Sequence, residues 1–120
     1  MAITTFQTLH TSEHTDLQVD ATVEYPATAA ATLFGLTLDN SENSADSFVK
    51  VYDAASAVVL GTTVPEDIYR VKAGQKRTIG YGRAAGKSFG SGVGLAAVTT
   101  GGVSGTTAPA NKVRATVFTS

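Results

Sequence analysis

Hydrophobic and polar residues alternate over much of the chain with a period of two, which differs from the longer period of an amphipathic helix. The clearest run covers residues 16–25, where the odd-numbered positions from Leu17 to Tyr25 are apolar or aromatic and most even-numbered positions are polar. Such alternation places successive side chains on opposite faces of an extended strand. We therefore predict a half-buried strand over this run, stopped at Pro26, which lacks the N–H that a sheet ladder needs.

Similar short segments recur along the rest of the chain, separated by residues that favour turns. Residues 58–60 predict either a short strand or a packed loop, and the glycine-rich stretch 80–94 predicts tight turns or bulges. Seven or eight short strands without a linker predict one antiparallel β-sandwich of the jelly-roll or immunoglobulin-like kind. The other predicted strands cover residues 32–38, 47–53, 67–72, 76–81, 93–99 and 112–118.

The composition supports this all-β prediction. Charged residues make up only 16% of the chain, and the polar surface is supplied largely by threonine, serine and 12 glycines. Threonine favours strands and glycine favours turns, whereas exposed helices are usually rich in Glu, Lys and Arg. Residues 1–15 are rich in threonine and show no clear period, so we interpret them as an irregular N-terminal arm. Residues 16–120 are then the single sandwich domain.

Charge and hydropathy argue against two classes of partner. Nine basic and ten acidic residues are interleaved and give a net charge of −1, so we expect no nucleic-acid partner. The densest basic run, which we interpret as a solvated face, consists of Lys72, Lys76, Arg77, Arg83 and Lys87. We also expect no membrane partner, because no apolar run approaches the ~20 residues that cross a bilayer. No secretory signal is visible, so we expect synthesis in a cytosol.

Two glycine-rich motifs resemble catalytic loops, and we interpret both as chance matches. Three residues separate Gly82 from Gly86 ahead of Lys87 and Ser88, whereas a phosphate-binding loop needs four. The stretch 86–90 also fits the G-x-S-x-G nucleophile pattern. That site needs a following helix and a later histidine, yet no histidine follows His14. We therefore expect no catalytic residue, and no cysteine is present to supply a thiolate.

Two further patterns could hold a metal ion. His10, Glu13 and His14 fit the H-x-x-E-H zinc signature, which requires a helix so that residues four apart share a face. The acidic loop around Asp39 and Asp46 could offer oxygens to calcium, but the spacing of a calcium-binding EF-hand loop is missing. We interpret these patterns as an exposed arm and a solvated loop. We therefore expect no metal ion and no cofactor.

Two longer stretches carry a resemblance to known proteins. Residues 48–75 contain FVKVYDAAS, GTTVP and VKAGQ, and residues 86–109 contain AAVTTGG and TTAP. Together these phrases resemble small structural proteins of tailed bacteriophages over roughly residues 33–118, although stretch 80–86 is more basic than expected of that group. The resemblance implies a β-sandwich component of the virion. Its leading role is a capsid decoration (cement) protein that stabilises the head shell, followed by a tail or fibre accessory protein.

This resemblance also implies a partner, which is the major capsid protein or a neighbouring virion subunit, with a homo-oligomer as a further option. A decoration protein acts through contact area, and a rigid domain reduces the ordering cost of docking. A carbohydrate-binding module of a receptor-recognition tip is an alternative, with Tyr52, Tyr69 and Tyr81 as candidate platforms for a glycan. An enzyme of unknown type is a further alternative, against which stands the lack of an acid–base set. We predict contact residues at Phe6, Leu9, Tyr81, Arg83, Lys87 and Phe89.

Overall fold

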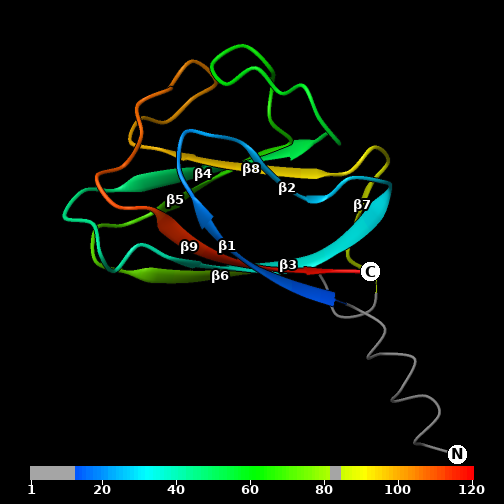
Figure 1. Cartoon of the computed structure of the whole chain (residues 1–120). Helices are drawn as coiled ribbons and strands as arrows, with labels where there is room; N and C mark the ends of the chain where they lie inside the picture. Colours follow the sequence, from blue (N-terminus) through cyan, green and yellow to red (C-terminus); the bar gives the residue numbers. More distant parts are fainter. Residues whose placement is uncertain (1–12, 82–84) are drawn as a thin grey trace, which may run out of the picture.

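The computed structural model describes residues 13–81 and 85–120, and within these ranges the chain consists of β-strands and loops (Figure 1). It confirms the predicted all-β fold. The described residues contain no helix that is long and apolar enough to cross a membrane. The strands are β1 Glu13–Val19, β2 Glu24–Ala27, β3 Ala31–Asp39, β4 Ser47–Asp53, β5 Asp67–Val71, β6 Lys76–Gly80, β7 Lys87–Phe89, β8 Val93–Val98 and β9 Val113–Thr119.

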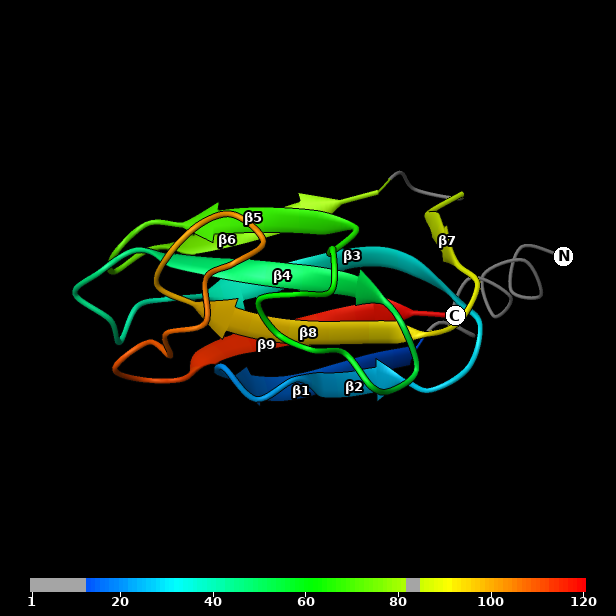
Figure 2. The ribbon, with the colours of Figure 1, turned by 90° about the horizontal axis from the view of Figure 1, so that it is seen from above.

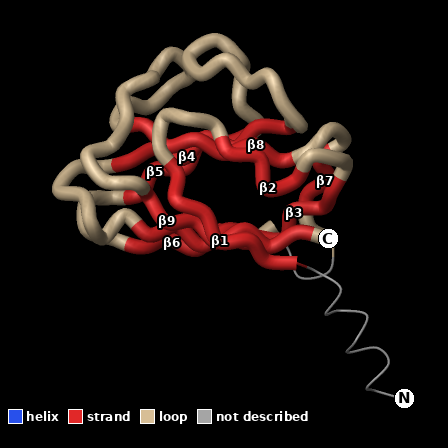
Figure 3. Tube along the Cα trace, viewed as in Figure 1, coloured by secondary structure: helices blue, strands red, loops and turns tan. Residues whose placement is uncertain are grey.

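Two antiparallel sheets form the layers of a sandwich, as predicted (Figure 3). The first sheet has the order β1-β9-β3-β6, with β7 also paired to β3, and the second sheet has the order β2-β8-β4-β5. Strands of the first half pair with strands of the second half in nested order: β1 with β9, β2 with β8, β3 with β6 and β4 with β5. As a result, β1 and β2 form one long side of the sandwich and β5 and β6 form the other (Figure 2).

The core lies between the two sheets and follows the alternation in the sequence. In β9, Val113, Ala115 and Val117 are buried, whereas Arg114 and Phe118 point to the outer face and are exposed. Burial of one such valine or leucine side chain contributes about 1.5–3 kcal/mol. Strand β8 differs, because all of its residues are buried and both of its faces are therefore covered.

The prediction of one strand over residues 16–25 is wrong, because the chain changes sheets within it. The Asp20 carboxylate accepts a hydrogen bond from the Thr22 N–H at 2.8 Å, and this turn takes the chain from β1 to β2. Pro26 lies inside β2 and does not end it. Since β2 is an edge strand, a residue without an N–H can be accommodated there.

The predicted boundary of the N-terminal arm is also corrected. Residues 13–15 belong to β1 and pair with Thr119, Phe118 and Val117 of β9. They continue β1 toward the N-terminus, but none of them is apolar, so the alternation of hydrophobic and polar positions did not reveal them. The rest of the predicted arm, residues 1–12, lies outside the described residues.

The glycine-rich stretch 80–94 contains a short strand, β7, that was not predicted. Its pairing with β3 places Phe89 opposite Ala31 and inside the core, with 1% of its surface exposed. Gly92 follows with φ +154°, and a Cβ there would lie 2.5 Å from the carbonyl oxygen of Ala27. The close approach of these two backbone segments therefore requires glycine at this position.

Candidate functional site

The outer faces of the two sheets differ in their covering. Two loops, residues 54–66 and 99–112, lie over the outer face of the second sheet (Figure 1). Beneath them the outward residues of β4 and β8 are buried, including Lys50 and Tyr52 at 0% and 1% exposure. We call this the capped face. It explains why β8 is buried on both sides.

Lys50 connects the capped face to its covering loop. Its ammonium donates hydrogen bonds to the backbone carbonyls of Val103 at 2.9 Å and Gly105 at 2.8 Å. Burial lowers the pKa of Lys50 from its usual value. Within the described residues no carboxylate lies within 4 Å of this ammonium, so the loop carbonyls are its counterparts. Lys50 therefore helps to hold the 99–112 loop on the sheet.

The outer face of the first sheet, which we call the open face, carries no described loop (Figure 1). The strand registers arrange its side chains in three rows that run across the sheet. One row contains His14 and Phe118, and glycines occupy its other two positions. Phe118 is 39% exposed, and its ring centroid lies 6.1 Å from that of His14. The rows are His14-Phe118-Gly35-Gly80, Asp16-Thr116-Thr37-Thr78 and Gln18-Arg114-Asp39-Lys76.

The chemistry of the open face suits contact with another protein surface. The row Asp16-Thr116-Thr37-Thr78 contains three threonines. Their short side chains carry no charge and lose little conformational entropy when a contact orders them. The charged row contains one acid and two bases, and Asp16 of the middle row accepts a hydrogen bond from the Thr116 hydroxyl at 2.8 Å. The face is therefore broad, its two acids and two bases balance in charge, and it has one exposed aromatic ring as an anchor.

A polar cluster closes the gap between β5 and β6. The Tyr69 and Tyr81 hydroxyls are hydrogen-bonded to each other, and the Tyr81 hydroxyl donates to the Asp67 carboxylate at 3.2 Å. Lys87 donates to the same carboxylate at 2.8 Å, and this bond raises the pKa of the Lys87 ammonium. Burial raises the pKa of Tyr81, so its hydroxyl stays protonated at neutral pH. These groups satisfy one another's hydrogen-bond donors and acceptors, and they connect β5 to Tyr81 and β7 on this side of the sandwich.

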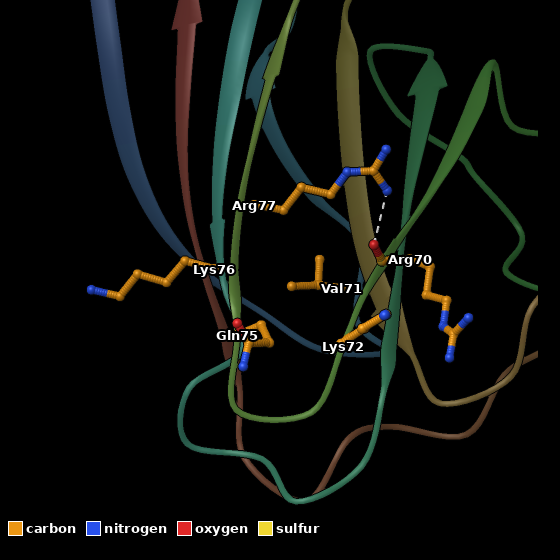
Figure 4. Close-up of a pocket in the computed structure, with 6 residues that line it drawn as sticks. All are labelled: Arg70, Val71, Lys72, Gln75, Lys76 and Arg77. Carbon is orange, nitrogen blue, oxygen red and sulfur yellow. Dashed lines mark hydrogen bonds between the residues drawn. The ribbon is translucent and has the colours of Figure 1, made fainter.

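A shallow groove of about 380 Å³ lies farther along the same side (Figure 4). Its cations do not converge on one point, because Arg70 and Lys76 extend to opposite sides of the groove. Arg77 donates to the carbonyl of Arg70 at 2.9 Å, and its guanidinium carbon lies 5.4 Å from the Tyr69 ring centroid. The lining residues are Arg70, Val71, Lys72, Gln75, Lys76 and Arg77.

The predicted contact residues fall into three groups. Phe6, Leu9 and Arg83 lie outside the described residues. Tyr81 is half-buried and Lys87 retains 33% of its side-chain surface, and both belong to the polar cluster. The choice of Phe89 is corrected, because this ring lies in the core and presents no surface to a partner. The open face was not predicted from the sequence, because its rows combine residues from strands that are far apart in the chain.

The structure also shows where the described residues of the two glycine-rich motifs and of the zinc signature lie. Ser88 lies in the middle of β7 and pairs with Thr32, so the strand-to-helix turn of a nucleophile elbow is absent from this described segment. Gly86 has φ +64° and precedes the same strand, while residues 82–84 lie outside the description. His14 lies on a strand, where the helical spacing of the zinc signature does not apply. His10 lies outside the described residues.

The acidic loop 39–46 is organised by amide side chains. Asn40 is fully buried and donates to the carbonyls of Ala45, Val71 and Lys72, while its oxygen accepts from Asn43 and Ser47. The prediction of a solvated loop is therefore wrong for Asn40 and Asn43, which are buried. The three carboxylates of the loop have different partners: Asp39 pairs with Lys76, Glu42 with Arg114 and Asp46 with Arg70. In residues 13–81 and 85–120, no three His, Asp or Glu side chains gather in a way that could hold a metal ion.

The candidate glycan platforms are less accessible than predicted. Tyr52 is buried, and the hydroxyls of Tyr69 and Tyr81 are hydrogen-bonded to each other. A sugar ring needs an exposed aromatic face to stack on, which Tyr52 does not offer. Comparison with known proteins adds no assignment: no family model, no curated protein and no solved structure matches this chain.

Proposed function

We propose that this protein is a structural component of a bacteriophage virion, and that it decorates the capsid by adhesion of its open face to the shell. The observation that carries the proposal is the difference between the two faces. Loops cap one face, and Lys50 holds the 99–112 loop there, whereas the other face carries no loop of the described residues and exposes Phe118. A rigid domain with one uncapped face can bind a shell with little loss of conformational entropy.

The topology supports a finer proposal, that the sandwich is a jelly roll. Eight strands divide into two four-stranded paths, and their nested pairing matches one long folded ribbon wrapped into two sheets. Jelly rolls are frequent in viral capsid and lectin domains. Because one fold serves many functions, this support is an analogy, and the faces of the molecule carry the functional argument.

The proposal implies that the protein acts without catalysis. The Tyr69-Tyr81-Asp67-Lys87 cluster consists of groups that hydrogen-bond to one another, and its hydroxyls are kept protonated by burial. Nucleophilic catalysis requires a group activated by a base or by a lowered pKa, and these tyrosines are shifted in the opposite direction. We therefore interpret the cluster as a brace of the sandwich.

Rebinding to virions tests the proposal. Phage particles produced without this chain are incubated with the purified protein, and bound protein is measured after sedimentation. We expect the wild type to rebind and to raise the temperature at which the heads release DNA. Phe118→Glu should abolish both effects. Val64→Glu is the matched control, because Val64 is 74% exposed on the loop of the capped face.

The outcomes separate the candidate roles. Loss of rebinding with Val64→Glu but not with Phe118→Glu would place the contact on the capped face and refute the docking face. Rebinding to isolated tails instead of heads would favour the tail or fibre accessory role. Absence of the chain from purified virions would refute the virion assignment as a whole.

A further inference from the structure

Around the groove, the side formed by β5 and β6 carries an excess of cations, whereas the side formed by β1 and β2 carries an excess of carboxylates. On the side formed by β5 and β6, four exposed cations gather around the groove: Arg70, Lys72, Lys76 and Arg77. We call this the basic side. On the side formed by β1 and β2 and the turn between them, the carboxylates are Asp16, Asp20 and Glu24, and we call this the acidic side. Figure 2 shows that these sides lie at opposite edges of both sheets.

Each side keeps charge that nearby groups leave uncompensated. On the basic side, Arg70 pairs with Asp46 and Lys76 lies 3.9 Å from Asp39. Within the described part of the chain, Lys72 and Arg77 have no carboxylate within 4 Å.

On the acidic side, Asp20 lies 3.9 Å from Lys112. Glu24 is exposed and has no cation within 4 Å in the ranges 13–81 and 85–120. The uncompensated charges on the two sides are therefore opposite in sign.

We propose that the basic side of one molecule binds the acidic side of a second copy, so that the chains associate side by side in one direction. The strand directions permit this arrangement. Each sheet path has four strands in antiparallel order, so β6 runs opposite to β1 and β5 runs opposite to β2. A neighbour related by translation then places each edge strand beside an antiparallel one, and both sheets can continue across the joint.

The register places the charges near one another in such a pair. Lys76 and Gln18 occupy the same row across the first sheet, through Arg114 and Asp39. Asp16 and Asp20 lie two residues on either side of Gln18. Translation without a shift therefore places Lys76 between two carboxylates of the neighbour.

Two observations favour a second copy over a nucleic acid as the occupant of the basic side. The cations extend in different directions, so they suit a broad surface better than a single phosphate. Asp39 and Asp46 lie among them, so this surface alternates in sign. It suits a partner side that offers Lys112 beside its carboxylates better than a uniformly anionic phosphate backbone. The contact is heterologous, because different surfaces meet, and it gives a ring or an open row instead of a closed dimer.

Sedimentation of the purified full-length chain tests the inference directly. We expect concentration-dependent association in about 0.05 M NaCl that weakens at least about tenfold in about 0.5 M NaCl, because exposed charges are screened by salt. Lys72→Glu with Lys76→Glu should leave the chain monomeric, and so should Asp16→Lys with Glu24→Lys. An equimolar mixture of the two double variants should associate again, because each acidic side then meets a basic one.

Arg114→Glu is the control, since Arg114 lies on the interior strand β9 and not on an edge strand that would meet the neighbour. It should keep the wild-type association, and circular dichroism melting should show that every variant remains folded. A wild type that stays monomeric at low salt, or double variants that associate as well as the wild type, would overturn the inference. Binding of a labelled single-stranded oligonucleotide that Lys72→Glu with Lys76→Glu abolishes, without self-association, would assign the basic side to nucleic acid instead. This test needs no virion, so it can fail independently of the proposed function.

Discussion

Replacement of Lys50 tests whether the capped face is held closed from within. Lys50→Met keeps a long apolar side chain and removes the ammonium, which leaves the carbonyls of Val103 and Gly105 without their donor. Both carbonyls belong to the 99–112 loop. We expect the variant to fold, with this loop less firmly attached to the sheet.

The magnitude follows from two opposing contributions. A hydrogen bond from a charged donor contributes about 1.5–3 kcal/mol, so loss of both bonds removes about 3–6 kcal/mol. Removal of a buried ammonium also eliminates its desolvation penalty, which is on the order of several kcal/mol. We therefore expect Lys50→Met to lower the free energy of unfolding by about 1–3 kcal/mol. Lys50→Ala should lower it further, because the lost methylene groups leave a cavity.

Urea denaturation measures the difference in stability, and amide hydrogen exchange shows where it arises. Exchange should accelerate in residues 99–112 and remain unchanged in β3. The pH dependence gives a second readout, because burial lowers the pKa of Lys50 in the folded state. Between that lowered pKa and the unfolded value of 10.5, the unfolded chain binds more protons. The stability of the wild type relative to Lys50→Met should therefore rise with pH in this window.

A Lys50→Met variant as stable as the wild type, within about 0.5 kcal/mol, would contradict the assigned role of these hydrogen bonds. Unchanged exchange in residues 99–112 would refute the attachment of the loop through Lys50. A stability difference that falls with increasing pH would show that the ammonium is favoured, and not penalised, by its buried position.

Three further substitutions test the packing. The Tyr52 hydroxyl is buried with no hydrogen-bond partner in the described residues, so Tyr52→Phe should raise the free energy of unfolding by about 1 kcal/mol in urea denaturation; a loss of stability would reveal a partner. Gly92→Ala should lower the melting temperature by an amount equivalent to at least about 2 kcal/mol, whereas Gly90→Ala, with open space around its Cβ, should change it little. Asn40→Ala removes all of the side-chain hydrogen bonds of a buried amide and should lower the free energy of unfolding by about 3 kcal/mol; an effect below about 1 kcal/mol would contradict this network.

Most strands could be predicted from the sequence because alternation reports which side chains face a core. The predicted strand 47–53 coincides with β4, and the buried positions of β9 follow the expected order. The alternation does not predict the point at which the chain passes from one sheet to the other. Residues 20–23 continue the pattern of β1, so the turn held by the Asp20 carboxylate could not be distinguished from a continuing strand.

The burial of Lys50 could not be predicted, because the loop that covers it lies more than 50 residues later in the chain. The prediction of Phe89 as a contact residue was wrong for a related reason. Its glycine neighbours indicate turns, yet its pairing with β3 draws it into the core. The basic run was recognised in the sequence, but the opposite charges of the two sides become apparent only when the strand order is known.

The proposed capsid decoration can be examined by electron cryo-microscopy of the phage particles in which the chain is proposed to occur. We expect density for the sandwich on the outer surface of the head, with the β1-β9-β3-β6 sheet against the shell and Phe118 within the contact. The loops 54–66 and 99–112 should face away from it. Density that places these loops against the shell, or particles that lack the chain, would refute the proposed docking of the open face.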